Sequence, residues 1–252
     1  MNQLHDDERI NHPYNGCLTV IQKKEGYRYS IDAFLLASFV KIRKNERIIE
    51  LGTGCGIISL LLALKEKRAR IVAVEIQKNL FELAKKNVQI NKLDNIIDLL
   101  NIDLRDLPTI FPPDSFDLVI SNPPYRKLNS GRINPDPEKA IARHELFVSV
   151  SDITKIAKYL LKKRGKVFFI FPAIRFSAIS KAMVENSIIP SRLRSVHSYK
   201  DENATLILIE GRKEGGEGMV IQPPLIIYNK KREYSSEMKK IYSFYNIKEK
   251  EI

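Results

Sequence analysis

From residue 47 onward, short apolar runs alternate with segments of helical periodicity. Continuous apolar runs such as IIEL (48–51) and FDLVI (116–120) are typical of strands buried on both faces. Strands of this kind that alternate with helices predict an α/β fold with a doubly wound, mainly parallel sheet. Seven strands are expected, at 47–51, 70–76, 96–103, 116–121, 166–171, 193–199 and 204–210.

Helical periodicity predicts five helices. One precedes the first of these strands, at 31–41, and the others lie between the strands, at 56–67, 78–91, 145–163 and 174–186. Only a short polar turn separates the last two strands, so we expect them to form an antiparallel pair at one edge. Three units follow from this reading. They are an N-terminal arm and helix (1–45) with a short strand near 17–22, a core domain (46–212), and a basic C-terminal tail (213–252) packed on or near the core.

Charge narrows the range of partners. The 252 residues hold 42 Lys and Arg against 30 Asp and Glu, a formal net charge of +12. Such a surplus suits a polyanion, because neutralised phosphates release their counterions. Two cysteines form no disulfide framework and no metal-ligand spacing, so no metal is expected. No signal peptide or membrane span is recognisable, and we expect a cytoplasmic protein, with a monomer favoured.

The segment RIIELGTGCG (47–56) takes a predicted buried strand into a glycine-rich turn before a helix. Gly52, Gly54 and Gly56 allow the backbone to turn tightly and to approach a ligand closely. Their spacing is GxGxG. A nicotinamide dinucleotide site needs GxGxxG, and Ile57 stands where that fingerprint requires Gly or Ala, so such a cofactor is disfavoured.

Three carboxylates lie at the carboxyl ends of consecutive predicted strands, where ligands bind in open α/β sheets. Glu50 can reach the cationic amino-acid end of S-adenosylmethionine (SAM) directly or through water. Glu75 lies where a ribose-binding acid belongs, and Asp103 can accept from the cofactor's adenine amine. Ile76 and Leu104, the residues after the last two acids, are expected to line the same cofactor site.

The fourth predicted strand ends in FDLVISNPPY (116–125). This segment resembles the adenine and glutamine amino-methyltransferases, whose signature is [N/D]PPY after the fourth strand of a Rossmann-like SAM domain of class I. Asn122, Pro123, Pro124 and Tyr125 match that signature at every position, and the resemblance implies that they are catalytic. Asn122 is also expected to contact the cofactor.

The chemistry of an exocyclic amine explains these residue types. Its lone pair is delocalised into the ring, so the nitrogen is a weak nucleophile. The Asn122 side-chain oxygen and the Pro123 carbonyl can accept its two N–H groups and free the lone pair for methylation. The prolines fix that geometry in advance. Tyr125 offers a ring on which a flipped base stacks.

The stretch YRYSIDAFLLASF (27–39) also resembles bacterial amino-methyltransferases of the tRNA-adenine and HemK types. In that group the stretch packs over the cofactor, which implies Tyr29, Ser30 and Asp32 as pocket residues. An alternative is a simple helix start, with Ser30 as N-cap and Asp32 favoured by the helix dipole. The two interpretations are compatible.

Across its length the chain is most similar to the tRNA1(Val) (adenine(37)-N6)-methyltransferase family, through SIDAFLL, ELGTGCG, VAVEI, ISNPPY, ARHE and QPPLIIYN. The resemblance implies SAM-dependent methylation of the N6 amine of the adenine beside the anticodon of a valine tRNA. Basic residues in and beyond the loop after NPPY are candidate phosphate contacts. They are Arg126, Lys127, Arg132, Arg143, Arg192 and Arg194.

Other functions remain open from the sequence. A protein glutamine-N5 methyltransferase acting on release factors shares NPPY, but such enzymes usually carry a separate helical N-terminal domain that this short arm cannot supply. Adenine-N6 methylation of rRNA or DNA uses the same chemistry. A non-catalytic RNA-binding protein with a degenerate SAM fold is disfavoured by the intact set of acids and the NPPY corner.

Overall fold

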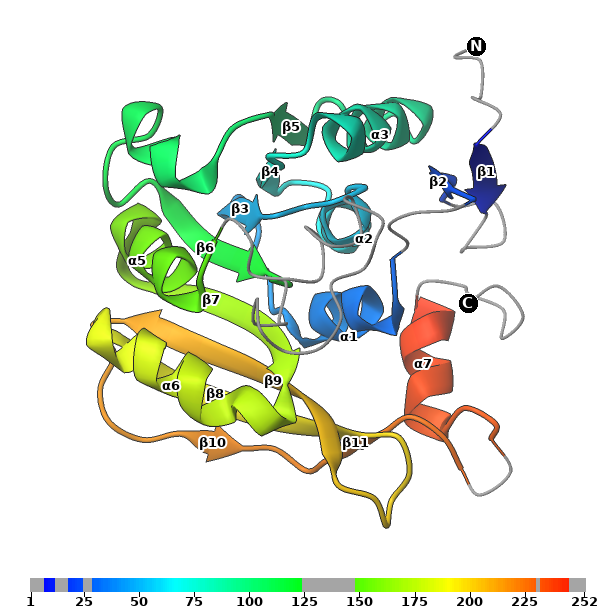
Figure 1. Cartoon of the computed structure of the whole chain (residues 1–252), viewed down its shortest axis with the longest axis vertical. Helices are drawn as coiled ribbons and strands as arrows, with labels where there is room; N and C mark the ends of the chain where they lie inside the picture. Colours follow the sequence, from blue (N-terminus) through cyan, green and yellow to red (C-terminus); the bar gives the residue numbers. More distant parts are fainter. Residues whose placement is uncertain (1–6, 12–17, 25–28, 124–147, 230–231, 245–252) are drawn as a thin grey trace.

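The computed structural model describes residues 7–11, 18–24, 29–123, 148–229 and 232–244. A mixed sheet runs through the centre of this part of the chain (Figure 1). From one side to the other, its main strands are β5 (Ile97–Leu100), β4 (Arg70–Val74), β3 (Arg47–Leu51), β6 (Phe116–Ser121), β7 (Leu161–Pro172), β9 (Ala204–Lys213) and β8 (Ile188–His197).

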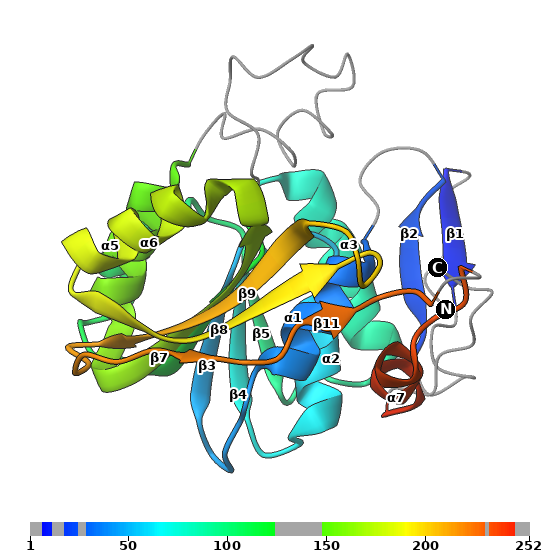
Figure 2. The same cartoon turned by 90° about the horizontal axis from the view of Figure 1, so that it is seen from below.

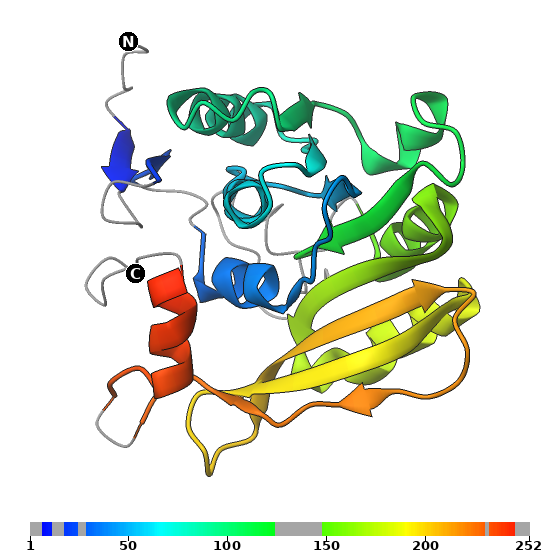
Figure 3. The ribbon, with the colours of Figure 1, turned by 180° about the vertical axis from the view of Figure 1, so that it is seen from behind.

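Helices cover both faces of the sheet (Figures 1 and 3). On one face lie α1 (Ile31–Phe39), α2 (Ile57–Lys65), α3 (Lys78–Ile90) and, beside α1, α7 (Ser236–Phe244). On the other lie η1 (Leu104–Thr109), α5 (Val150–Leu160), η2 (Ala173–Arg175) and α6 (Phe176–Glu185). None of the described helices is long and apolar enough to cross a membrane.

Along the central strands, successive apolar side chains point alternately into two hydrophobic cores, one on each face of the sheet. Ile48 and Leu118 pack with the α1 and α2 side chains, whereas Ile49 and Val119 pack with the α5 and α6 side chains. Successive side chains of a strand point to opposite faces, so a run that is apolar at every position buries both faces. The sequence pattern therefore explains why helices are needed on both sides.

The predicted fold class is confirmed: β5, β4, β3, β6 and β7 are parallel, and β8 and β9 form the expected antiparallel pair. Strand β9 lies between β7 and β8 and is antiparallel to both. Two short strands, β10 (Val220–Ile221) and β11 (Leu225–Ile226), pair in parallel with the outer side of β8.

Some predicted boundaries were wrong. Strand β5 ends at Leu100, three residues before the predicted end, and the chain then enters the unanticipated helix η1 with Asp103 as its N-cap. Strand β8 begins at Ile188 instead of residue 193, because Pro190 and Ser191 interrupt the apolar pattern at a β-bulge. The predicted strand near 17–22 is β2 (Val20–Lys23), which pairs with β1 (Glu8–Asn11).

Asn87 of α3 and Asn91, the C-cap of the same helix, attach the N-terminal arm to the core. Asn87 Oδ1 accepts from the Ile21 N–H at 2.6 Å, and its Nδ2 donates to the carbonyls of Ile21 and Cys55, both at 2.9 Å. Asn91 pairs in the same way with the N–H and carbonyl of Thr19, at 2.8 and 2.6 Å. The two side chains thus pair with the backbone N–H and carbonyl groups of Thr19 and Ile21, as the backbone of a neighbouring strand would. Asn87 also connects the arm to the glycine turn through Cys55.

Replacing Asn87 by alanine should destabilise the protein by about 3 kcal/mol, because it leaves buried backbone groups of Ile21 and Cys55 without partners. Urea unfolding at neutral pH measures the change. The control is Lys85→Ala, an exposed position on the same helix, which should change the free energy of unfolding by less than about 0.5 kcal/mol. Equal values for the two variants would contradict the role given to Asn87.

Candidate functional site

The carboxyl ends of β3, β4 and β6 meet at one edge of the sheet, which we call the carboxyl edge. Parallel pairing places Glu50 opposite Ala73 of β4 and Ile120 of β6. The glycine turn leaves β3 at this edge, and Asn122 leaves β6 directly beside it. In Figure 2, strands such as β3 and β4 are seen along their length. Candidate residues from distant parts of the sequence are therefore brought together by strand register alone.

The glycine turn follows the geometry that its sequence requires. Gly52, Gly54 and Gly56 have φ values of +77°, +59° and +87°, which side chains disfavour. The N–H groups of Gly52 and Thr53 both donate to the carbonyl of Val74, at 3.0 and 2.9 Å. A Cβ at Gly52 would meet no described atom within 4 Å. The turn is thus fixed to β4 and leaves open space above Gly52.

Glu50 is fully buried and has two unlike carboxylate oxygens. Oε2 accepts from the Thr53 hydroxyl at 2.7 Å, from the Ser59 N–H at 3.0 Å and from the Ser59 hydroxyl. Oε1 is buried without a hydrogen-bond partner among the described residues. Burial raises the pKa of Glu50 to about 7, against the lowering effect of the Ser59 and Thr53 hydrogen bonds. This carboxylate is stabilised on one side only.

Glu75 holds the other side of the turn. Its Oε2 accepts from the Gly54 N–H at 2.8 Å and its Oε1 from the Gln77 N–H at 2.9 Å. The side chain of Ile76 is 40% exposed, although Glu75 before it is buried. An apolar side chain exposed beside a buried carboxylate suits a ligand with a flat apolar part and hydroxyl groups.

Asp103 caps η1 and binds Arg105. Its Oδ1 accepts from the Arg105 N–H at 2.9 Å and from the guanidinium Nε at 3.0 Å. The hydrogen bond from the Arg105 side chain lowers the pKa of Asp103, so the group is ionised at neutral pH. Leu104 is buried below it. Asp103 remains at the carboxyl edge, but as a helix cap and not as a strand end.

Asn122 begins the NPPY corner next to the glycine turn. The Ser121 hydroxyl donates to the Leu51 carbonyl at 2.8 Å, which fixes the end of β6 against the end of β3. The side-chain Oδ1 of Asn122 is buried and has no hydrogen-bond partner among the described residues. Pro123 is buried. Pro124 and Tyr125 lie outside the part of the chain that the structure describes.

The amino end of α1 carries the remaining predicted cofactor residues. Ser30 caps the helix, and its hydroxyl accepts from the Asp32 N–H at 3.3 Å. Asp32 is buried in the first turn, and the Tyr29 ring meets Phe34 edge to face at 6.0 Å. The helix-start interpretation is confirmed. A second role toward a cofactor stays a prediction.

Four of the predicted phosphate contacts, Arg126, Lys127, Arg132 and Arg143, lie outside the described residues. Arg192, which the sequence placed among them, is mostly buried instead. Its guanidinium binds Glu210 at 2.7 Å, donates to the Phe39 carbonyl at 3.0 Å and stacks 3.7 Å from the Phe39 ring centroid. It connects β8 and β9 to the end of α1, and a contact with a substrate stays a prediction.

Arg194 also has partners within the fold, and its predicted contact with RNA is likewise untested. Its guanidinium binds Glu237 of α7 at 2.7 Å, and its Nε donates to the Pro223 carbonyl at 2.9 Å. It fixes the C-terminal tail to β8. The sequence could not reveal either partner, because both pairs join positions that lie at least eighteen residues apart and only the fold brings them together.

Sequence reasoning also missed Thr53, Ser59 and Asn87, which position the turn. A serine within the apolar run IISLLLAL was the available signal, because a polar residue on the buried face of a helix needs a partner. No group of three or more His, Cys, Asp or Glu with metal-binding geometry occurs among the described residues. Burial raises the pKa of the Cys55 thiol to about 12, so this cysteine is unsuited to act as a nucleophile.

A doubly wound sheet, a glycine turn held by carboxylates and an Asn-Pro corner at the next strand end define a methyltransferase of Rossmann-like fold, a class whose methyl donor is SAM. The chain belongs to the methyltransferase small domain family, which matches residues 30–171.

Curated relatives cover most of the chain. An Aliivibrio salmonicida protein named tRNA1(Val) (adenine(37)-N6)-methyltransferase is 26% identical over 73% of this chain and 77% of its own length. Proteins of the same name from Dyadobacter fermentans and Bacteroides thetaiotaomicron are 26% and 27% identical, over 84% and 88% of this chain. They are matched over 87% and 92% of their own lengths.

Solved structures agree on the fold. A predicted O-methyltransferase from Agrobacterium tumefaciens superposes with a TM-score of 0.68 at 19% identity, over 86% of this chain and 97% of its own. TYW2 from P. horikoshii, in complex with MeSAdo, gives a TM-score of 0.59 at 15% identity, over 84% of this chain and 74% of its own. At these identities the likeness concerns the fold alone.

Replacing Glu50 by glutamine should separate two effects of this carboxylate, the destabilisation of the fold caused by its burial and its contribution to SAM binding. The folded pKa of about 7 lies above the ordinary 4.5, so the folded state binds more protons between these values. The wild-type free energy of unfolding should therefore fall, relative to the variant, by about 3 kcal/mol as the pH rises from 4.5 to above 7. Urea unfolding from pH 5 to 8 without SAM measures the difference.

The same variant tests the ligand role of Glu50. Glutamine keeps an acceptor for Thr53 and Ser59 but removes the charge that suits an ammonium group. Calorimetry at pH 8 should show SAM affinity reduced by about tenfold or more, together with a more stable apoprotein. Unchanged SAM affinity would mean that Glu50 only supports the turn.

Proposed function

We propose that the protein transfers a methyl group from SAM to the N6 amine of an adenine in tRNA, at position 37 of a valine tRNA as its relatives' name states. One observation carries the proposal: the buried side-chain oxygen of Asn122, without a partner among the described residues, beside the glycine turn. An acceptor left open in a buried position costs free energy, so a donor from a ligand would stabilise it.

The residues at the carboxyl edge fit SAM. The open oxygen of Glu50 would receive its ammonium group, and the space above Gly52 would admit the ligand close to the backbone. Glu75 would accept from the ribose hydroxyls, with Ile76 against the adenine. Tyr29, Ser30, Asp32, Gly54, Gly56, Asp103 and Leu104 complete the proposed set. When bound, SAM supplies a methyl group activated by a positively charged sulfur.

Asn122 and Pro123 would hold the amine of the substrate. The Asn122 side-chain oxygen and the Pro123 carbonyl accept one N–H each, which turns the nitrogen lone pair toward the donor site. The stiff Asn-Pro bond keeps both acceptors in place before the substrate arrives, so little reorganisation is needed. By resemblance, Tyr125 would stack on the base. The proton of the methylated amine is acidic enough to leave to water without a dedicated base.

The excess positive charge and the family name support RNA as the substrate. A net charge of +12 favours a polyanion over a protein substrate. Named relatives matched over 77–92% of their own lengths are tRNA methyltransferases. No observation favours a glutamine residue of a release factor.

Incubation with SAM and unmodified tRNA should produce N6-methyladenosine, detected by mass spectrometry of nucleosides after complete digestion. A valine tRNA with adenine 37 replaced by guanine is the matched substrate control and should stay unmodified. Transfer of labelled methyl groups to release factor but not to any tRNA would overturn the proposal.

Asn122→Ala should leave folding intact and weaken SAM binding far less than it lowers kcat, which should fall by about 100-fold, the effect of removing one preorganised hydrogen-bonding group. Single-turnover assays with saturating tRNA measure the rate. Ser121→Ala is the companion variant. It loosens the attachment to Leu51 without removing the acceptor, so its kcat should fall far less. Full activity in Asn122→Ala would refute the assigned role.

A further inference from the structure

The opposite edge of the sheet, where the parallel strands begin, gathers positive charge. We call it the amino edge and define it by five segments, the starts of parallel strands with the residues before them: 41–47, 66–70, 92–96, 113–117 and 161–166. These segments carry twelve Lys and Arg against five Asp and Glu. They thus hold an excess of seven positive charges out of the chain's net +12, within about a ninth of its length.

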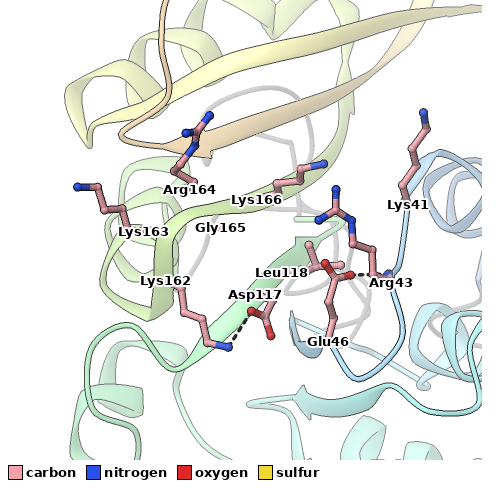
Figure 4. Close-up of a pocket in the computed structure, with 10 residues that line it drawn as sticks. All are labelled: Lys41, Arg43, Glu46, Asp117, Leu118, Lys162, Lys163, Arg164, Gly165 and Lys166. Carbon is pink, nitrogen blue, oxygen red and sulfur yellow. Dashed lines mark hydrogen bonds and ion pairs between the residues drawn. The ribbon is translucent and has the colours of Figure 1, made fainter.

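A cleft of about 280 Å³ opens at this edge between the start of β6, the start of β7 and the segment before β3 (Figure 4). Among the described residues that line it, Leu118 has the only apolar side chain. The others are Lys41, Arg43, Glu46, Asp117, Lys162, Lys163, Arg164, Gly165 and Lys166. A second cleft of about 270 Å³ at the same edge is lined by Lys67, Arg68 and Arg70 with Asn45, Ala69, Asn95 and Ile96.

The carboxylates of the first cleft are already engaged. Asp117 accepts from the Lys162 Nζ at 2.7 Å and from the Arg47 N–H at 2.8 Å. Glu46 accepts from the Arg43 N–H at 2.6 Å. Lys41, Arg43, Lys163 and Arg164 form no ion pair with any described carboxylate. Four cations around one cleft thus lack counter-charges among the residues that the structure describes.

Two of these cations, Lys163 and Arg164, lie at the start of strand β7. Its register against β6 jumps from Leu161 to Lys166 within two residues of β6, so that 162–165 bulge out of the sheet. Arg164 has a φ of +61°, which disfavours a side chain. A Cβ at Gly165 would come within 2.8 Å of the Lys162 carbonyl and 3.1 Å of the Asp117 carbonyl. The bulge is therefore tightly packed and points its charged side chains outward.

Helix ends do not account for this charge. Helices α1, α2, α3 and α5 end at the amino edge, and each C-terminus carries roughly half a negative charge. Their sum of about two negative charges is well below the excess of seven. Moreover, Lys65, which lies outside the five segments, already donates to the carbonyls of Ala37 and Ser38 at the end of α1, at 2.9 and 3.2 Å.

We propose that the amino edge binds the phosphodiester backbone of the RNA substrate at a point away from the methylated base. This rests on the proposed function. The cleft is lined by cations, and among its described lining residues none is aromatic and only Leu118 is apolar, so it suits phosphates and not a nucleoside. The strand β6 separates the two edges by about 20 Å, at roughly 3.3 Å for each of its six residues. To contact both edges, an RNA must extend at least this far from the methylated base.

The double variant Lys41→Glu/Lys163→Glu tests the proposal, because its two positions lie on different segments and form no ion pair with a described residue. Lys85→Glu/Lys155→Glu, at exposed positions of α3 and α5, is the control with the same change of charge. Urea unfolding of both confirms that they fold. The amino-edge variant should bind full-length tRNA at least about tenfold more weakly at 100 mM salt, with a smaller salt dependence.

Turnover separates this surface from the catalytic site. The amino-edge variant should keep the wild-type kcat at saturating tRNA and the wild-type SAM affinity, while its KM for full-length tRNA rises at least about tenfold. Its KM for a short anticodon stem-loop should match that of the control variant. Equal tRNA binding by the two double variants, or an equal loss with the stem-loop, would overturn the proposal.

Failure of the proposed function would look different. In that case the wild-type protein would methylate no tRNA, whereas the binding comparison between the two double variants would still show whether the amino edge contacts RNA.

Discussion

Two buried carboxylates hold the glycine turn from opposite sides, and the rest of the site depends on them. Glu75 accepts from the Gly54 N–H, and Glu50 accepts from the Ser59 N–H in the first turn of α2. The turn therefore cannot move without breaking buried charge-assisted hydrogen bonds. Through the Cys55 carbonyl, Asn87 carries the same constraint to the N-terminal arm. The turn, the start of α2 and the arm form one unit, against which the end of β6 is fixed.

This arrangement is costly before a ligand arrives. Glu50 is buried with one oxygen that no described residue contacts, and Asn122 has a buried acceptor in the same condition. A buried group without a partner destabilises a protein by roughly 1–3 kcal/mol. Buried polar groups without partners are rare in folded proteins, and they are expected chiefly at functional sites. The two open acceptors lie on the two sequence motifs that the family resemblance connects to SAM and to the substrate amine, so the cost falls where a ligand can offset it.

Local patterns predicted most of the fold and the centre of the site. Continuous apolar runs marked the parallel strands, and positions after strand ends marked Glu50, Glu75 and Asn122. Errors arose where a long-range partner decided the outcome. Arg192 and Arg194 read as surface cations, but Glu210 and Glu237 bind them within the fold. A single sequence records neither such pairs nor the bulge in β7, because both depend on which strands become neighbours.

The helix dipoles favour charge of opposite sign at the two edges of the sheet, although the positive excess at the amino edge is larger than the helix ends require. Helices antiparallel to the strands place their positive ends at the carboxyl edge and their negative ends at the amino edge, which favours acids at the first and cations at the second. Acids such as Glu75 and Asp103 suit a cationic cofactor, but they repel the backbone of an RNA. An RNA therefore needs cations that offset this repulsion, such as the basic residues that follow NPPY in the sequence and, by our proposal, those of the amino edge. At about 20 Å, the amino edge lies beyond the screening length of roughly 8–10 Å at physiological salt. Cations there can attract RNA without neutralising the acids that we propose to hold the cofactor.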